Sequence, residues 1–206
     1  MATGGDEKQV PWTIQGKVVL ITGANTGIGY ETALEIAKRG AKKVILACRN
    51  VDLAGKAIEE IKKVVGGSNH CELASVQLDL SSLESVRKCA QHLLDNEPVL
   101  NVLINNAGVH ATNEARQVTA DGFELTFHTN HLGHFLLTNL LLPLLKRSKP
   151  SRIVVVASMA YQFCWPSGLT IDDLNAERPG KYDAFNACRF LCFLFIHFLN
   201  SVISIL

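Results

Sequence analysis

The feature that most constrains the fold is a glycine-rich segment between an apolar run and a helical pattern. The run KVVLITGA, residues 17–24, has the length and β-branched content of a buried strand. It passes directly into the segment TGANTGIG, residues 22–29, and helical spacing of apolar residues begins at Gly27. Where a strand enters a helix through glycines, free N–H groups and the positive end of the helix dipole face the turn. The segment therefore predicts an anion-binding turn.

From their spacing, the three glycines of this segment are expected to have different structural roles. Gly23 permits a tight turn, Gly27 lets the backbone approach a diphosphate, and Gly29 allows the helix to pack closely on the strand. A glycine-rich turn without a ligand is the alternative, but strand, spacing and helix together favour a dinucleotide site. The residues predicted to bind the cofactor here are Thr22, Gly23, Asn25, Thr26, Gly27, Ile28 and Gly29.

Apolar periodicity divides the rest of the chain into alternating strands and helices. Short apolar runs predict further strands at residues 41–48, 74–80, 99–108 and 151–158. Helices are predicted at 27–40, at 51–67, after a capping box of Ser81 and Glu84, and at about 121–146 with a break near Pro143. Strands that alternate with helices form βαβ units with right-handed crossovers. The pattern predicts an α/β fold, a doubly wound (Rossmann) parallel sheet flanked by helices.

Composition excludes several other classes of protein. The 206 residues are 48% hydrophobic and 19% charged, so the chain is not a disordered segment. A net charge of +1 gives no basic excess that would indicate nucleic-acid binding. Six cysteines without framework spacing fit a reducing compartment, and the first twelve residues hold no apolar signal-peptide core. These features favour a cytoplasmic protein.

Five motifs in order resemble the short-chain dehydrogenase/reductase family. They are the T-G-x-x-x-G-x-G turn from Thr22 to Gly29, Asp79 in LDL, the NNAG sequence from Asn105 to Gly108, NHLGHF from Asn130, and Ser158. The runs ILACRN, LDLSSLESVR and NHLGHF look most like the retinol-dehydrogenase-like and WW-domain-oxidoreductase-like branch. The resemblance covers about residues 16–187, which are expected to form an incomplete NADP-binding domain between a polar lead-in, 1–15, and a divergent tail, 188–206.

The resemblance implies hydride transfer between a nicotinamide cofactor and a lipophilic, retinoid-like alcohol or carbonyl. Asp79 would contact the adenine, and Asn106, Ala107 and Gly108 would lie against the cofactor. Ser158 would hold the substrate oxygen and Asn130 would support the proton relay. A homodimer, or a heterodimer with a full-length sibling, is a further implication.

The end of the second predicted strand bears on the choice of cofactor. A dinucleotide without a 2′-phosphate is held by a carboxylate at this position, but the sequence reads Cys48-Arg49-Asn50. Arg49 is a permanent cation whose planar donors suit a phosphate. A surface arginine without a ligand is the alternative. The missing acid and Arg49 together favour NADP(H) over NAD(H).

The catalytic pair that the resemblance implies is missing. In the family a tyrosine supplies the proton, and a lysine four residues later lowers the pKa of that tyrosine. None of Tyr30, Tyr161 and Tyr182 is followed by lysine at that spacing, and the register puts Cys188 and Cys192 at the two positions. The sequence therefore predicts a chain without catalytic activity.

The residues after Ala187 suggest why the pair is missing. The family normally continues with two more strands and a substrate lid, whereas this sequence turns apolar and stops at Leu206. A truncated chain is expected, from alternative splicing, a frameshift or a gene-model error. The apolar stretch 190–206 approaches the lower limit of a membrane span, about 17 residues. A buried helix is favoured over a membrane anchor for this stretch. Two alternatives to an enzyme remain for the chain as a whole: a catalytically dead isoform that binds the cofactor or a partner, and a tail-anchored membrane protein.

Two other residue pairs have the spacing of metal ligands on a helix. His131 and His134 lie three residues apart, but no third ligand stands at useful spacing. Cys188 and Cys192 lie four residues apart and also lack companions. Structural roles are favoured for all four, and no metal site is predicted.

Overall fold

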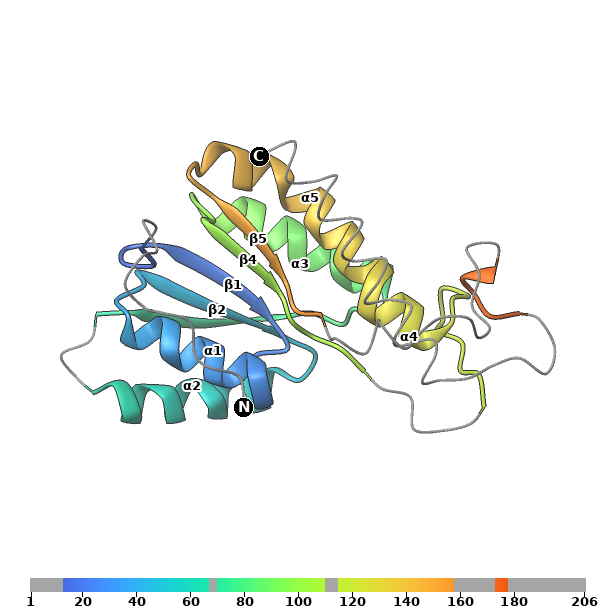
Figure 1. Ribbon diagram of the computed structural model, residues 1–206, viewed down its shortest axis with the longest axis horizontal. Coiled ribbons are helices and arrows are strands. Elements are labelled where there is room, and N and C mark those ends of the chain that lie inside the picture. Colours follow the sequence, from blue (N-terminus) through green and yellow to red (C-terminus); the bar gives the residue numbers. More distant parts are fainter. Residues whose placement is uncertain (1–12, 67–69, 110–114, 158–172, 178–206) are drawn as a thin grey trace, which may run out of the picture.

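The computed structural model describes residues 13–66, 70–109, 115–157 and 173–177. Within these residues five strands form one parallel sheet, in the order β3-β2-β1-β4-β5 (Figure 1). The strands are β1 (Val18–Thr22), β2 (Lys43–Cys48), β3 (Glu72–Gln77), β4 (Val102–Asn105) and β5 (Arg152–Val155). The strand order reverses at β1, so the loops after β1 and β4 flank a crevice at the carboxyl edge. The predicted doubly wound parallel sheet is confirmed.

Two helices cover each face of the sheet (Figure 1). Helices α1 (Gly27–Lys38) and α2 (Val51–Val65) pack on one face. Helices α3 (Leu83–Asn96) and α5 (Gly133–Arg147) pack on the other. A short helix α4 (Leu125–Phe127) and a π-helical turn η1 (His128–Leu132) lead into α5.

Alternate residues of β1 enter two separate cores. Val18 and Leu20 pack with α3 and α5, whereas Val19 and Ile21 pack with α1 and α2. A strand that is covered on both faces has no polar side, which explains the continuous apolar run in the sequence. The central strand is thereby fixed in direction and register, and its last residue, the buried Thr22, lies at the carboxyl edge of the sheet.

Several details of the helices and strands differ from the prediction, and the predicted strand 99–108 is shorter, as β4 covers residues 102–105. Ser82, rather than Ser81, caps α3 by accepting from the N–H of Ser85, because the Ser81 hydroxyl is engaged by Asp79. Strand β3 covers residues 72–77 rather than 74–80. Pro143 does not break the helix: it lies inside α5, which continues to Arg147, and its side chain is exposed.

The irregular part of the helical stretch lies instead before α5. The N–H of Gly133 bonds to the carbonyl of His128, five residues back, which defines the π-helical turn η1. Turns of this kind are rare in proteins, and those that occur are often found at functional sites. This turn contains Asn130.

Some predicted features lie outside the described residues. They are Ser158, Tyr161, Tyr182 and the tail 188–206 with Cys188 and Cys192. Within the described part of the chain, no helix combines the length and the apolarity that a bilayer span requires.

Strand β5 carries exposed apolar side chains. Among the described strands its one neighbour is β4. Val154 in β5 is 42% exposed, and Val156, just after the strand, is 40% exposed. An edge strand with apolar side chains offers unpaired N–H and C=O groups to another molecule. We therefore expect this edge to be a site of self-association.

We predict that the purified 206-residue chain forms oligomers, and that Val154→Lys shifts it toward the monomer, because a charge on an edge strand opposes strand addition. Light scattering over a concentration series measures the change. Val64→Lys is the matched control, since Val64 is 57% exposed on α2, away from the edge. A monodisperse monomer of the unsubstituted chain in detergent-free buffer would contradict the prediction.

Candidate functional site

A cavity of about 460 Å³ lies at the carboxyl ends of β1, β2 and β4. This volume is within the range of small-molecule and cofactor sites. Its lining brings together most of the residues predicted to bind a dinucleotide. The lining residues are Gly23, Asn25, Thr26, Ile28, Gly29, Ala47, Cys48, Arg49, Leu78, Asp79, Leu80, Asn106, Ala107, Gly108, Val109 and Thr129.

The glycine-rich turn is shaped as its spacing predicts. Gly23 and Gly27 have φ of +65° and +57°, a conformation that side chains disfavour. A Cβ at Gly23 would lie 2.9 Å from the Cα of Ala107. A Cβ at Gly29 would overlap the carbonyl oxygen of Gly23 and lie 2.6 Å from Nδ2 of Asn106. Among the described residues nothing lies within 4 Å of a Cβ at Gly27, and Gly27 itself is not among the lining residues.

The first turn of α1 has no side-chain cap. Thr26 occupies the N-cap position but its hydroxyl accepts no backbone N–H. By contrast, Asn50 accepts from Leu53 at the start of α2, and Ser82 caps α3. The N–H groups at the start of α1 therefore remain available to an anion at the cavity.

Among the residues that the structure describes, the cavity lining includes one acidic side chain, Asp79, and one basic side chain, Arg49. Arg49 follows β2 and is exposed, while the neighbouring Asn50 is used as the cap of α2. Asp79 has a fixed orientation because its Oδ1 accepts from both the N–H (2.9 Å) and the hydroxyl (2.6 Å) of Ser81. The end of β2 thus presents a cation and the end of β3 presents a carboxylate.

The hydroxyl of Thr22 holds the loop after β4 against the turn after β1. Its Oγ1 accepts from the backbone N–H of Asn106 and of Ala107, both at 2.9 Å. The side-chain amide of Asn106 returns a bond to the carbonyl of Thr22, also at 2.9 Å. Thr22 itself is fully buried and does not line the cavity, so its contribution is to hold the walls.

Asn130 binds the backbone just beyond this loop. Its Oδ1 accepts from the N–H of Val109 at 2.7 Å, and its Nδ2 donates to the carbonyl of Val109 at 2.8 Å. Both polar ends of the amide are therefore engaged by one residue. The preceding Thr129 lines the cavity.

The histidines beside Asn130 lie in two different surroundings. His131 stacks between Phe127 and Phe135, with ring centroids 5.8 and 6.3 Å away, and burial lowers its pKa to about 4. His134 is buried with its Nε2 2.8 Å from Oγ1 of Thr22. Within the described part of the chain no three His, Cys, Asp or Glu side chains form a metal-binding group.

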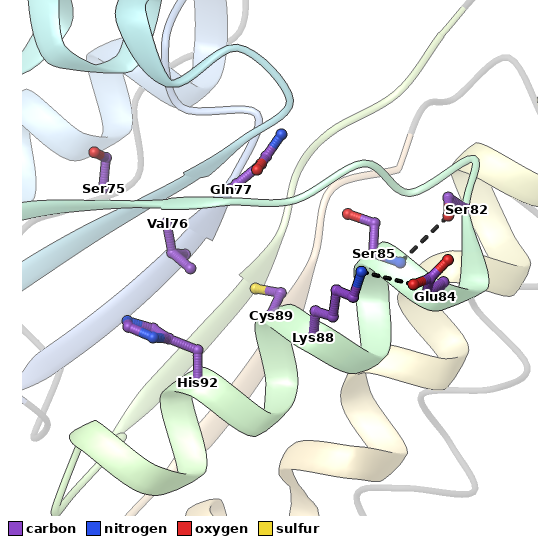
Figure 2. Close-up of a pocket in the computed structure, with 9 residues that line it drawn as sticks. All are labelled: Ser75, Val76, Gln77, Ser82, Glu84, Ser85, Lys88, Cys89 and His92. Atoms are coloured by element: carbon purple, nitrogen blue, oxygen red, sulfur yellow. Dashed lines mark hydrogen bonds and ion pairs between the residues drawn. The ribbon is translucent and has the colours of Figure 1, made fainter.

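A second cavity, of about 500 Å³, lies between β3 and α3 (Figure 2). Several of its polar groups are paired with one another or with the backbone: Lys88 with Glu84, and Ser82 with the N–H of Ser85. Burial raises the pKa of the Cys89 thiol to about 12, so this thiol is not a nucleophile near neutral pH. The cavity beside the glycine-rich turn is the better candidate site.

Comparison with known proteins agrees with this geometry. The model of the short chain dehydrogenase family matches residues 17–169, more than half of the chain. The chain belongs to the short-chain dehydrogenase family. The family resemblance of the sequence motifs is therefore confirmed.

Several members of the family with retinol dehydrogenase names are similar in sequence. Human retinol dehydrogenase 14 is 46% identical over 185 residues, which covers 85% of this chain and 52% of that protein. Human retinol dehydrogenase 11 is 51% identical over 148 residues, with coverages of 72% and 45%. This chain thus spans about half the length of the curated relatives it matches.

Solved short-chain dehydrogenase structures share the fold. The NADP active-site complex of RhlG from Pseudomonas aeruginosa has a TM-score of 0.69 and 23% identity, covering 93% of this chain and 69% of that chain. A member from Burkholderia phymatum in complex with NAD has a TM-score of 0.67 and 24% identity, with coverages of 91% and 60%. Identities this low support the fold alone, so they do not distinguish the two cofactors.

Motif analysis did not single out every residue of the site. Ala47, Cys48, Leu78, Leu80, Val109 and Thr129 line the cavity without having been predicted. All but Ala47 directly adjoin predicted site residues, so position next to a motif is the signal that could have found them. Ala47 lies two residues before Arg49, and Thr129 precedes Asn130 in η1.

We predict that Gly29→Ala destabilises the chain by about 1–3 kcal/mol, because the new methyl group would overlap the Gly23 carbonyl and contact Asn106. Chemical denaturation gives the free energy of unfolding. Gly55→Ala in α2 is the control, since nothing lies within 4 Å of its Cβ position among the described residues. It should stabilise the chain by up to about 1 kcal/mol. Equal effects of the two substitutions would contradict the prediction.

Proposed function

We propose that this chain binds NADP(H) in the cavity beside the glycine-rich turn and that the 206-residue chain does not itself reduce carbonyls. Short-chain dehydrogenases use a nicotinamide cofactor, which is the starting point of the proposal. The observation that carries it is the uncapped start of α1 beside Gly23 and Gly27, where backbone N–H groups can hold a diphosphate.

The remaining cavity residues fit the other half of such a cofactor. Leu78 and Leu80 are buried apolar residues on either side of Asp79, a pattern that suits the edge and face of an adenine ring. Asn106, Ala107 and Gly108 form the opposite wall, and the bonds to Thr22 fix their backbone. The residues present therefore fit a dinucleotide.

The end of β2 supports a 2′-phosphate on that cofactor. A carboxylate here would accept from both ribose hydroxyls and repel a phosphate. The described lining has Ala47, Cys48 and Arg49 at this point, and Arg49 is exposed with a planar donor group. Burial raises the pKa of the Cys48 thiol, so this residue adds no negative charge near neutral pH.

We predict that the chain binds NADPH more tightly than NADH, and that Arg49→Ala weakens NADPH binding about tenfold without changing NADH binding, because one charged contact to the phosphate is lost. Fluorescence or calorimetric titration gives both dissociation constants. Arg87→Ala removes an equal charge from the exposed face of α3, outside the cavity, and should change neither constant. Equal affinities of the unsubstituted chain for the two cofactors would refute the preference.

The parent reaction that we propose is oxidation or reduction of a small lipophilic alcohol or carbonyl. The retinol dehydrogenase names of the relatives suggest a retinoid-like substrate. The cofactor, when bound, supplies or accepts the hydride. Among this chain's own residues, Ser158 would hold the substrate oxygen. Asn130 would act by position, since its amide oxygen and its amide nitrogen are each bonded to the backbone of Val109.

The proton donor that this reaction requires is missing from the sequence. No tyrosine between Met1 and Leu206 is followed by lysine four residues later. Serine and asparagine side chains can orient a carbonyl, but neither donates a proton near neutral pH as an activated phenol does. We therefore infer that this chain retains cofactor binding and lacks turnover.

We predict no carbonyl-dependent oxidation of NADPH by the purified chain with retinal-like or simple aromatic carbonyls. Positioned acid–base groups contribute about 10²–10⁴-fold, and both members of the pair are absent. The assay follows NADPH absorbance at cofactor saturation, with Ser158→Ala as the control for contaminating enzymes. Turnover that Ser158→Ala abolishes would overturn the inactivity but not the cofactor binding. Placing Tyr and Lys at positions 188 and 192 should restore little activity.

A further inference from the structure

One turn of helix contacts the ends of three strands that border the cavity. The side chain of Asn130 binds Val109, just beyond β4. Gly133 lies so close to Leu80, beyond β3, that a Cβ would overlap the Leu80 carbonyl oxygen. His134 bonds to Thr22, the last residue of β1. The turn therefore joins three loops that are far apart in the sequence.

His134 is the fully buried member of this turn. The ring is 1% exposed, with Nε2 2.8 Å from Oγ1 of Thr22 and Nδ1 3.1 Å from the carbonyl oxygen of Asn130. Burial lowers its pKa to about 4, so the ring is neutral at pH 7. One ring nitrogen then donates and the other accepts.

The partners of Thr22 determine which nitrogen donates. Its Oγ1 already accepts from two backbone N–H groups, of Asn106 and Ala107. A hydroxyl oxygen has two acceptor sites, so a third donor from His134 cannot be accommodated. The Thr22 hydroxyl must donate to Nε2, which leaves the proton on Nδ1 to be donated to the Asn130 carbonyl. The imidazole therefore accepts from β1 and donates to η1.

The accepting nitrogen orients the Thr22 hydroxyl. With its proton directed at His134, both lone pairs of Oγ1 face the loop after β4. Without that acceptor, the nearest alternative in the described structure is the carbonyl of Ile104 at 3.5 Å, a poorer distance. A hydroxyl turned toward Ile104 holds the N–H groups of Asn106 and Ala107 less well.

We propose that His134 is a positioning residue of the cofactor site, which fixes the turn after β1, the loop after β4 and Asn130 in one arrangement. Its role in binding rests on the proposed function, but its effect on the loop does not. A purely structural role, in which His134 only attaches α5 to the sheet, is the competing explanation.

Thr138 allows the two explanations to be separated. It lies one turn further along α5, is also fully buried, and accepts from Nδ2 of Asn105 at 3.0 Å. Asn105 is the last residue of β4 and does not line the cavity. Loss of the Thr138 hydroxyl therefore weakens the attachment of α5 without reaching the cofactor walls.

The test compares three variants of the full chain. His134→Gln keeps an acceptor near the position of Nε2, His134→Asn keeps a donor near the position of Nδ1, and Thr138→Val is the control. Amide hydrogen exchange of Asn106 and Ala107, relative to the amides of β2, reports the loop. Titration with NADPH reports the site.

We expect His134→Asn to speed exchange at Asn106 and Ala107 about tenfold over wild type and to weaken NADPH binding about tenfold, the effect of one buried hydrogen bond. His134→Gln should restore both to within about threefold of wild type, because it keeps the acceptor. Thr138→Val should leave the loop exchange and the NADPH affinity unchanged while lowering global stability.

Two results would overturn the proposal. One is unchanged loop exchange in His134→Asn. The other is an equal effect on the loop in His134→Asn and Thr138→Val, which would indicate attachment of α5 alone. If the wild-type chain binds no NADPH, the proposed function fails, and the exchange data still decide whether His134 positions the loop.

Discussion

The hydroxyl of Thr22 is the point on which the candidate site depends, since β1, β4 and α5 meet there. It accepts from two backbone N–H groups of the loop after β4 and lies 2.8 Å from the ring of His134. Thr22 and His134 are buried and the two bonds to the loop are partly buried, so leaving the Thr22 hydroxyl without its partners would cost about 1–3 kcal/mol. The cost of desolvation therefore makes the arrangement specific. Each donor needs Oγ1 of Thr22 as its acceptor, so the position of this hydroxyl fixes the position of the cavity walls.

Close backbone approaches let this network form. Gly23 lies against Ala107, Gly29 against Asn106, and Gly133 against Leu80, at distances that a side chain would not permit. In each pair a glycine of one segment meets a loop residue of another. The glycines thus bring the polar groups within bonding distance, and the hydrogen bonds then hold the segments in place. Neither feature suffices without the other.

The sequence predicts the sheet well because its signals are local, whereas the network is not local. Apolar runs and glycine turns reveal strands and their order of winding. The predicted third strand runs to residue 80 because Leu78 and Leu80 continue its apolar pattern. In the structure both residues are buried but lie beyond the end of β3. Of two adjacent serines, Ser82 became the cap since Asp79 engages Ser81. His134 meets Thr22 across 112 positions, and no periodicity encodes such a contact.

The residues that hold the cavity walls and most of the residues expected to catalyse the reaction lie in different parts of the sequence. As far as the structure describes them, the hydrogen bonds that hold the cavity walls join residues between Thr22 and His134. Of the residues that the family would use for catalysis, Asn130 lies within this stretch, whereas Ser158 and the expected positions of the tyrosine and lysine, 188 and 192, follow later. These described wall contacts are all made by residues that precede Ser158. The proposed cofactor binding therefore rests on a different stretch of the chain from the expected positions of the catalytic serine, tyrosine and lysine, which is why we propose that binding persists without turnover.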